Sequence, residues 1–209
     1  MKTYLDLESW PRKEHFHFFR KFSEPFFGAT VTVDCTKAYE NAKAQQIPFF
    51  IYYLHKTLTA VNEIEPFRYR VDDDKVLIHD RIDGSATIAR ENGSFGFSLI
   101  EFTIDMERFT RDAKIEIHRV QNADGLFTRE FPVDNLIHFS SIPWLDFTSL
   151  SHARSYDFPD SCPKVSFGKM AIAGDGTRTM PMSVHVHHAL MDGYHMGVFV
   201  ERVRELMSE

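Results

Sequence analysis

Two strand-like runs near the C-terminus, joined by a tight turn, constrain the fold of this chain most strongly. Residues 164–171 and 179–187 flank Gly174-Asp175-Gly176, and this arrangement predicts a β-hairpin of long strands. After Gly193 the apolar period changes to that of a helix, whose buried face carries Met196, Phe199, Val200, Val203 and Leu206. A long hairpin that leads directly into an amphipathic helix predicts a sheet with helices packed on it.

The segments upstream show both helical and strand-like patterns of apolar residues, and the expected helices and strands do not strictly alternate. Helices are expected after a Ser9 cap with Pro11 in the first turn, over 48–62, and from an Asp105 cap to residue 121. The first of these carries Phe16, Phe19 and Phe22 and ends at Pro25. Strands are expected at 30–34, 87–89, 97–104 and 137–140, with a hairpin of 67–71 and 75–79, and residues 122–135 as a loop. This order predicts an α+β fold, a two-layer sandwich of a mixed β-sheet with helices packed on it.

Charge and composition exclude several classes of protein. Lys and Arg total 24 against 30 Asp and Glu, a net charge of −6, which argues against a large nucleic-acid surface. No run approaches the roughly 20 apolar residues that a membrane helix requires, and no leader segment is visible. Two cysteines, Cys35 and Cys162, are too few for a disulfide framework. We expect one domain over residues 1–209, soluble and cytoplasmic, in which some of the 20 Phe line a pocket or a subunit interface.

The segment from Ser183 to His195 is the most informative for chemistry. Strand alternation places Val184, Val186 and His188 on one face, so His188 ends a strand beside apolar surface. An imidazole in such a setting is suited to general-base work. Most histidines so placed are packed, hydrogen-bonded core residues, and spacing alone leaves both interpretations open.

His185 and His187 share the other face of the same strand. Two imidazoles could ligate Zn²⁺, but a site needs at least a third protein ligand, and none is placed nearby. We therefore expect no metal, with these histidines on a solvated or subunit-facing surface.

The run His187-His188-Ala189-Leu190-Met191-Asp192-Gly193-Tyr194-His195 resembles the signature of the chloramphenicol acetyltransferases, which belong to the CoA-dependent acyltransferases. Further blocks resemble that family in the same order: 10–16, then 65–68 with Asp80, then 140–144 with Phe147, then 167–169 and 180–182. The resemblance covers nearly the whole chain.

The resemblance implies specific roles for four residues. His188 would act as general base on the acceptor hydroxyl, whose oxygen attacks acetyl-CoA directly. Ser140 would hydrogen-bond the resulting oxyanion. Arg12 and Asp192 would form a structural salt bridge that orders the site. The family is trimeric with sites between subunits, so a homotrimer is expected.

The expected acceptor is chloramphenicol, which implies antibiotic resistance. The positions that match the family's acceptor pocket are Phe19, Pro25, Phe95, Phe131, His152 and Ser166. Pro25, His152 and Ser166 depart from the family's usual residues, and His152 in place of an aliphatic side chain could favour another hydroxylated acceptor. Three alternatives stay open: the same chemistry on another alcohol, a non-catalytic relative, and a lipoyl-dependent acyltransferase core. The last lacks its usual lipoyl modules and linkers here.

Overall fold

A seven-stranded mixed sheet forms the centre of the computed structural model, which describes residues 3–131, 134–154 and 159–209. The strands lie in the order β2-β10-β8-β7-β5-β6, and short β9 pairs with β10. Their bounds are β2 Phe26–Asp34, β5 Asp83–Ala89, β6 Phe95–Phe97, β7 Leu136–Ser141, β8 Lys164–Phe167, β9 Ala171–Ile172 and β10 Arg178–His187. Strands β5, β7 and β8 are parallel, whereas β10 runs antiparallel to both of its neighbours. The sheet is therefore mixed, as the sequence predicts.

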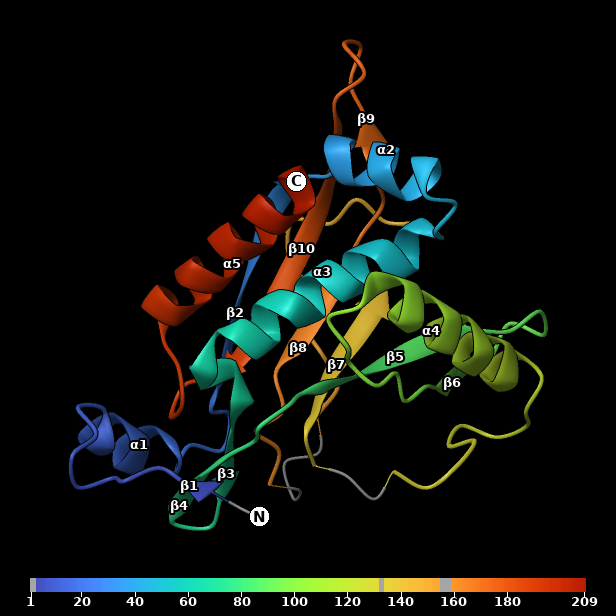
Figure 1. The fold of residues 1–209 in the computed structure, drawn as a ribbon. Helices are drawn as coiled ribbons and strands as arrows, with labels where there is room; N and C mark the ends of the chain where they lie inside the picture. The colour runs from blue at the N-terminus through green and yellow to red at the C-terminus, as the bar shows by residue number, and fades with distance from the viewer. Residues whose placement is uncertain (1–2, 132–133, 155–158) are drawn as a thin grey trace.

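Four helices cover one face of this sheet (Figure 1). They are α2 Thr36–Ala44, α3 Phe49–Glu63, α4 Met106–Gln121 and α5 Gly193–Ser208. Helix α3 lies at the centre of this layer and is apolar nearly all round, with ten of its residues buried. The helix layer and the sheet together confirm the predicted α+β architecture. Among the described residues, no helix is long and apolar enough to cross a membrane.

A smaller lobe lies beside one end of the sheet. It consists of the short helix α1 Lys13–Phe19, the 3-10 helix η1 Glu65–Arg68 and a three-stranded sheet. That sheet is formed by β1 Thr3–Tyr4, β4 Lys75–Ile78 and β3 Tyr69–Asp72. The predicted hairpin is confirmed here, with Asp73 at its turn in the left-handed region (φ 55°).

The register sorts the side chains of the large sheet between two faces. Phe139, Val165 and Val184 are paired neighbours and are buried against the helices. Ser140, Ser166 and Ser183 are paired neighbours on the opposite face, because side chains alternate along each strand. We call this second side the open face, since the four helices lie on the other side (Figure 1).

The structure corrects several sequence predictions. Helix α1 ends at Phe19 and does not reach Phe22, and its N-cap is Arg12 because the Ser9 hydroxyl bonds Asp6 instead. The expected strand 97–104 is wrong beyond Phe97, where residues 98–104 form no strand and only Ile100 makes an isolated bridge, to Gly84. Strands β2 and β5 are longer than expected, and helix α2 was not predicted.

The C-terminal hairpin is confirmed, but its first strand is interrupted. Gly168 divides residues 164–171 into β8 and β9, both of which pair with β10. A Cβ on Gly168 would lie 2.5 Å from Pro181 Cγ and 2.7 Å from the Leu145 carbonyl oxygen. Only glycine fits this close approach of the backbone to Pro181 and Leu145. The chain leaves the sheet after β8 and pairs with β10 again in β9.

Candidate active site

His188 follows the last residue of β10 and lies between two phenylalanine rings. Its imidazole stacks on the ring of Phe19 in α1, with ring centroids 3.9 Å apart. It also contacts the ring of Phe27 in β2, with ring centroids 4.6 Å apart. Its backbone N–H donates to the Pro25 carbonyl at 2.8 Å. Phe19 and Pro25, both expected near the acceptor, thus contact His188 itself.

The hydrogen bond of the His188 ring fixes its tautomer. Nδ1 lies 3.2 Å from the Met191 carbonyl oxygen. A carbonyl oxygen can only accept, so Nδ1 carries the proton and Nε2 of the neutral ring keeps its lone pair. The side chain is half-buried. An oriented imidazole with a free Nε2 is able to take a proton from a hydroxyl.

Arg12 and Asp192 form the ion pair that the family resemblance implies. Asp192 is also the N-cap of α5, where its carboxylate accepts from the Tyr194 N–H at 3.0 Å and from the His195 ring at 2.8 Å. Burial opposes ionisation of this carboxyl, but His195 and Arg12 outweigh it and hold its pKa below the usual value. Arg12 also donates to the His188 carbonyl at 3.4 Å. The pair therefore ties α1 and α5 to the backbone of His188.

Ser140 lies on the open face near the end of β7, in a row of hydroxyls. It pairs with Ser166 of β8, which pairs with Ser183 of β10. Ser166 is fully buried, and its Oγ has no hydrogen-bond partner among the described residues. An unpaired buried hydroxyl costs about 1–3 kcal/mol, so this position favours a water or ligand as its partner.

One chain does not bring Ser140 and His188 together. From Ser140 on β7 to Ser183 on β10 there are two spacings between neighbouring strands, each about 4.8 Å. His187 lies four residues beyond Ser183 on β10, at a rise of about 3.3 Å per residue. These steps place the Cα atoms of Ser140 and His187 about 16 Å apart. A base and an oxyanion donor that serve one reacting group must both lie within hydrogen-bond reach of it. The two residues cannot do so within a single copy.

His152 lies over His185 on the open face, with the two rings edge to face at 4.8 Å. Burial and the neighbouring charges of His185, Lys164 and His138 lower the pKa of His152 to about 4. Gly28 leaves room for the His185 ring, since a Cβ there would overlap it. A cavity of about 270 Å³ adjoins these rings, lined by Glu24, Phe26, Phe27, Gly28, Ser151, His152, Arg154, Lys164 and His185. Phe27 lines this cavity and also touches His188.

The neighbouring histidine His187 is buried, so the expectation of a solvated side chain is wrong for it within one chain. Its Nδ1 accepts from the Ala189 N–H at 3.3 Å, and burial lowers its pKa to about 4. Among the described residues, no group of three His, Cys, Asp or Glu side chains is arranged to hold a metal ion.

Phe95 and Phe131 lie at the far edge of the open face, away from His188. Phe95 packs on Phe97 of the edge strand β6, and Phe131 packs on Phe127. Phe127 joins the two pairs, with its ring 5.2 Å from Phe97, and it is 66% exposed. Sequence reasoning missed Phe127, although an exposed aromatic in a loop is a signal for binding. The four rings form one apolar patch on the same face as Ser140.

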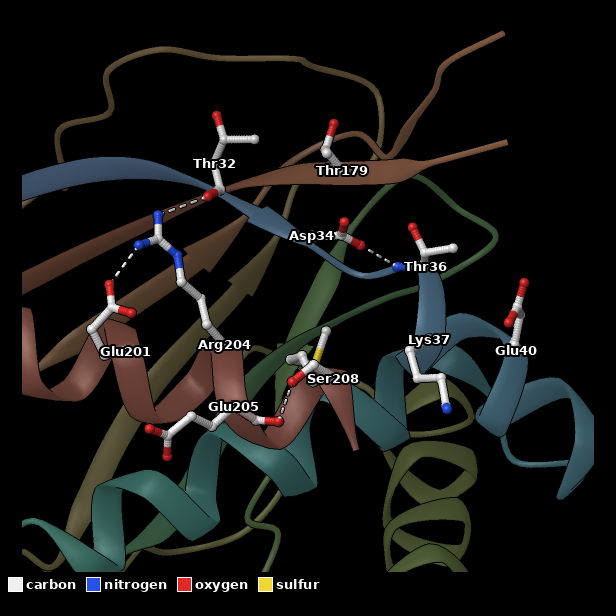
Figure 2. Close-up of a pocket in the computed structure, with 11 residues that line it drawn as sticks. Thr32, Asp34, Thr36, Lys37, Glu40, Thr179, Glu201, Arg204, Glu205 and Ser208 are labelled. Atoms are coloured by element: carbon white, nitrogen blue, oxygen red, sulfur yellow. Dashed lines mark hydrogen bonds and ion pairs between the residues drawn. The ribbon is translucent and has the colours of Figure 1, made fainter. Parts of the chain in front are cut away.

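A larger groove, of about 740 Å³, lies elsewhere. It is formed by the opposite ends of β2 and β10 with α2 and α5, and Figure 2 shows Arg204 there, bonded to Glu201 and to the Thr32 carbonyl. Thr179, which lines it, is eight residues from His187, about 26 Å along an extended strand. None of the candidate site residues lines this groove.

Comparison with known proteins gives a consistent result. A sequence model described as chloramphenicol acetyltransferase matches residues 1–204. Chloramphenicol acetyltransferase 3 of Escherichia coli is 28% identical over 209 residues, covering 99% of this chain and 97% of the relative. A solved chloramphenicol acetyltransferase is 33% identical with a TM-score of 0.88, over 99% of this chain and 100% of the other. A probable dihydrolipoamide acetyltransferase from Listeria monocytogenes shares the fold, with a TM-score of 0.67 at 15% identity over 93% of this chain and 88% of the other.

Proposed function

The chain belongs to the chloramphenicol acetyltransferase family, and from this premise we propose that it transfers an acetyl group from acetyl-CoA to a hydroxyl of chloramphenicol. The observation that carries the proposal is the His188 ring, whose Nδ1 faces the Met191 carbonyl and whose Nε2 is left as a base. Stacking on Phe19 adds a second restraint on the direction of that nitrogen. An oriented base of this kind typically contributes about 10²–10⁴-fold.

The proposed reaction is a direct transfer. Nε2 of His188 removes the acceptor's hydroxyl proton as the oxygen bonds to the thioester carbonyl carbon. The resulting oxyanion accepts a hydrogen bond from Ser140 Oγ. When the intermediate collapses, the C–S bond breaks, and the CoA sulfur takes the proton back from His188. The products are an acetyl ester and free CoA thiol, and no acyl-enzyme forms.

The site is proposed to form between copies of the chain, in a homotrimer. The Cα atoms of Ser140 and of His187, the residue before His188, are about 16 Å apart along the sheet of one copy. A neighbouring copy whose open face meets His188 would bring its own Ser140 to the reacting group. The patch of Phe95, Phe97, Phe127 and Phe131 would then give the acceptor an apolar wall on that face.

Thiol release from acetyl-CoA tests the proposal directly. Wild-type protein should release CoA thiol rapidly only when chloramphenicol is present, and His188→Ala should lose at least 10²-fold of this rate while keeping its melting temperature. Lys13→Ala, which removes an ion pair between the first residue of α1 and Glu8 in the preceding turn, is the matched control and should keep full activity. A His188→Ala variant with near-normal turnover would remove His188 from the role of base.

The cavity beside His152 and His185 supports a second candidate acceptor. His152, Lys164 and Glu24 line it, and His152 Nε2 lacks a hydrogen-bond partner among the described residues. A cavity with an unpaired polar atom in its wall favours an acceptor that can hydrogen-bond that atom. If chloramphenicol gives no thiol release, more polar hydroxylated acceptors are the alternative, with the same base and the same assay.

A further inference from the structure

The hydroxyl of Tyr53 extends from the helix layer to the end of β7, the strand that carries Ser140. It lies on α3 and is buried, and its hydroxyl donates to Ser141 Oγ at 3.1 Å. Burial raises the pKa of Tyr53 to about 12, so the hydroxyl keeps its proton at physiological pH. Its ring packs against Phe167 of β8 with centroids 4.6 Å apart.

Ser141 follows Ser140 and is the last residue of β7. Because side chains alternate, Ser141 points toward α3 and Ser140 toward the open face. Ser141 pairs with Phe167, the same residue on which the Tyr53 ring packs, and the next N–H, of Ile142, donates to the Phe167 carbonyl at 2.8 Å. The strand end is thus held from the helix side by one side-chain hydrogen bond and one aromatic contact.

We propose that Tyr53 is a positioning residue for Ser140, acting through Ser141. This inference rests on the proposed function, in which Ser140 Oγ bonds the oxyanion. A donor of this kind works only about 2.7–3.1 Å from the developing charge. Strand β7 ends one residue after Ser140, and beyond it the bond from the Ile142 N–H to the Phe167 carbonyl restrains the backbone. The Tyr53–Ser141 bond adds a side-chain restraint at this strand end and fixes the direction of the neighbouring Ser140 side chain.

Tyr53→Phe tests the inference, because it removes the hydroxyl and keeps the ring on Phe167. We expect kcat for acetyl transfer to fall roughly 5-fold with KM nearly unchanged, since misplacement by a fraction of an ångström weakens a bond made in the transition state. In a Ser140→Ala background the same change should lower kcat less than 2-fold. Tyr52→Phe is the matched control: it removes a hydroxyl from the same helix, where the ring lies under Lys56, and should leave kcat unchanged.

The outcomes separate this inference from the function on which it rests. If Tyr53→Phe lowers kcat equally with and without Ser140, or not at all, the positioning role is wrong while the roles of His188 and Ser140 stand. A Tyr53→Phe variant with a lower melting temperature but unchanged kcat would also overturn it, because Tyr53 would then contribute only to stability. If Ser140→Ala by itself costs nothing, the oxyanion role fails, and the positioning role fails with it.

Discussion

Arg12 and Asp192, 180 residues apart in the sequence, form an ion pair that closes the N-terminal lobe onto the start of α5. Asp192 does three things at once: it pairs with Arg12, caps α5 and accepts from His195. The pair is only partly buried, with side chains 13% and 34% exposed. Its loss should therefore cost less than the 3–5 kcal/mol typical of a fully buried pair.

Asp192→Ala should lower both stability and activity. Losing the N-cap costs about 0.5–2 kcal/mol, and the partly buried pair adds up to about 1 kcal/mol. At roughly 2–4 °C per kcal/mol for a chain of this size, the melting temperature should drop by about 1–12 °C. Calorimetry and thiol release measure the two effects, with Asp175→Ala, in the exposed β9–β10 turn, as the control. An inactive variant of unchanged stability would instead assign Asp192 a direct part in the chemistry.

Ser140→Ala should lower kcat by about 10²–10³-fold and change KM little, because the proposed bond forms mainly in the transition state. Ser183→Ala, in the same row of hydroxyls on the open face, is the matched control and should have a much smaller effect. Steady-state kinetics with both substrates measures this. An effect on KM alone would contradict the oxyanion role.

Two inactive variants should complement each other if the site lies between copies. In co-expressed mixtures of His188→Ala and Ser140→Ala chains, a site regains both groups when each neighbour supplies its intact residue. Random assembly at equal amounts restores about a quarter of the sites in a closed ring with head-to-tail interfaces. Mixing the separately purified variants without subunit exchange is the control. Co-expressed activity no greater than the sum of the two variants would place the whole site within one chain.

The acceptor range should change when His152 is replaced. His152→Leu removes a polar ring from the cavity beside His185 and makes it more apolar. We expect kcat/KM to rise for chloramphenicol relative to more polar alcohols, by about 10-fold, the size of effect that one pocket side chain supports. Competition assays with paired acceptors measure the ratio. An unchanged ratio would exclude His152 from acceptor selection.

Stability should fall as the pH drops from about 6.5 toward 4. Burial is the main cause that lowers the pKa of His187 and of His152 from 6.5 to about 4. Between these values the unfolded chain takes up protons that the folded chain does not, so the free energy of unfolding decreases. Carboxyls with lowered pKa, such as Asp160, add their effect only at lower pH.

Urea unfolding at pH 7.5 and 5.5 measures this decrease, and His187→Asn should make it smaller. An identical decrease in His187→Asn would contradict the assignment to His187.

Local sequence patterns determined much of this protein. The run that became α3 is apolar nearly all round, and those that became α4 and α5 are apolar on one side. The predicted Asp105 cap is confirmed, since its side chain accepts from the N–H groups of Glu107 and Arg108. Helix α2 was missed because it is polar, with only Ala38 and Ala42 buried, so it has almost no apolar period to detect. The single domain over residues 1–209 stays a prediction.

The candidate site divides in the same way. The sequence identified His188, Ser140, Arg12 and Asp192, because residue type and order along the chain carry the family resemblance. Only the tertiary structure placed Ser140 on the open face, far from His188, gave the His188 ring its Met191 partner, and joined Tyr53 to Ser141. Side-chain periodicity is local and can be read along the chain, whereas strand order and register depend on pairing between distant segments, which no local pattern specifies.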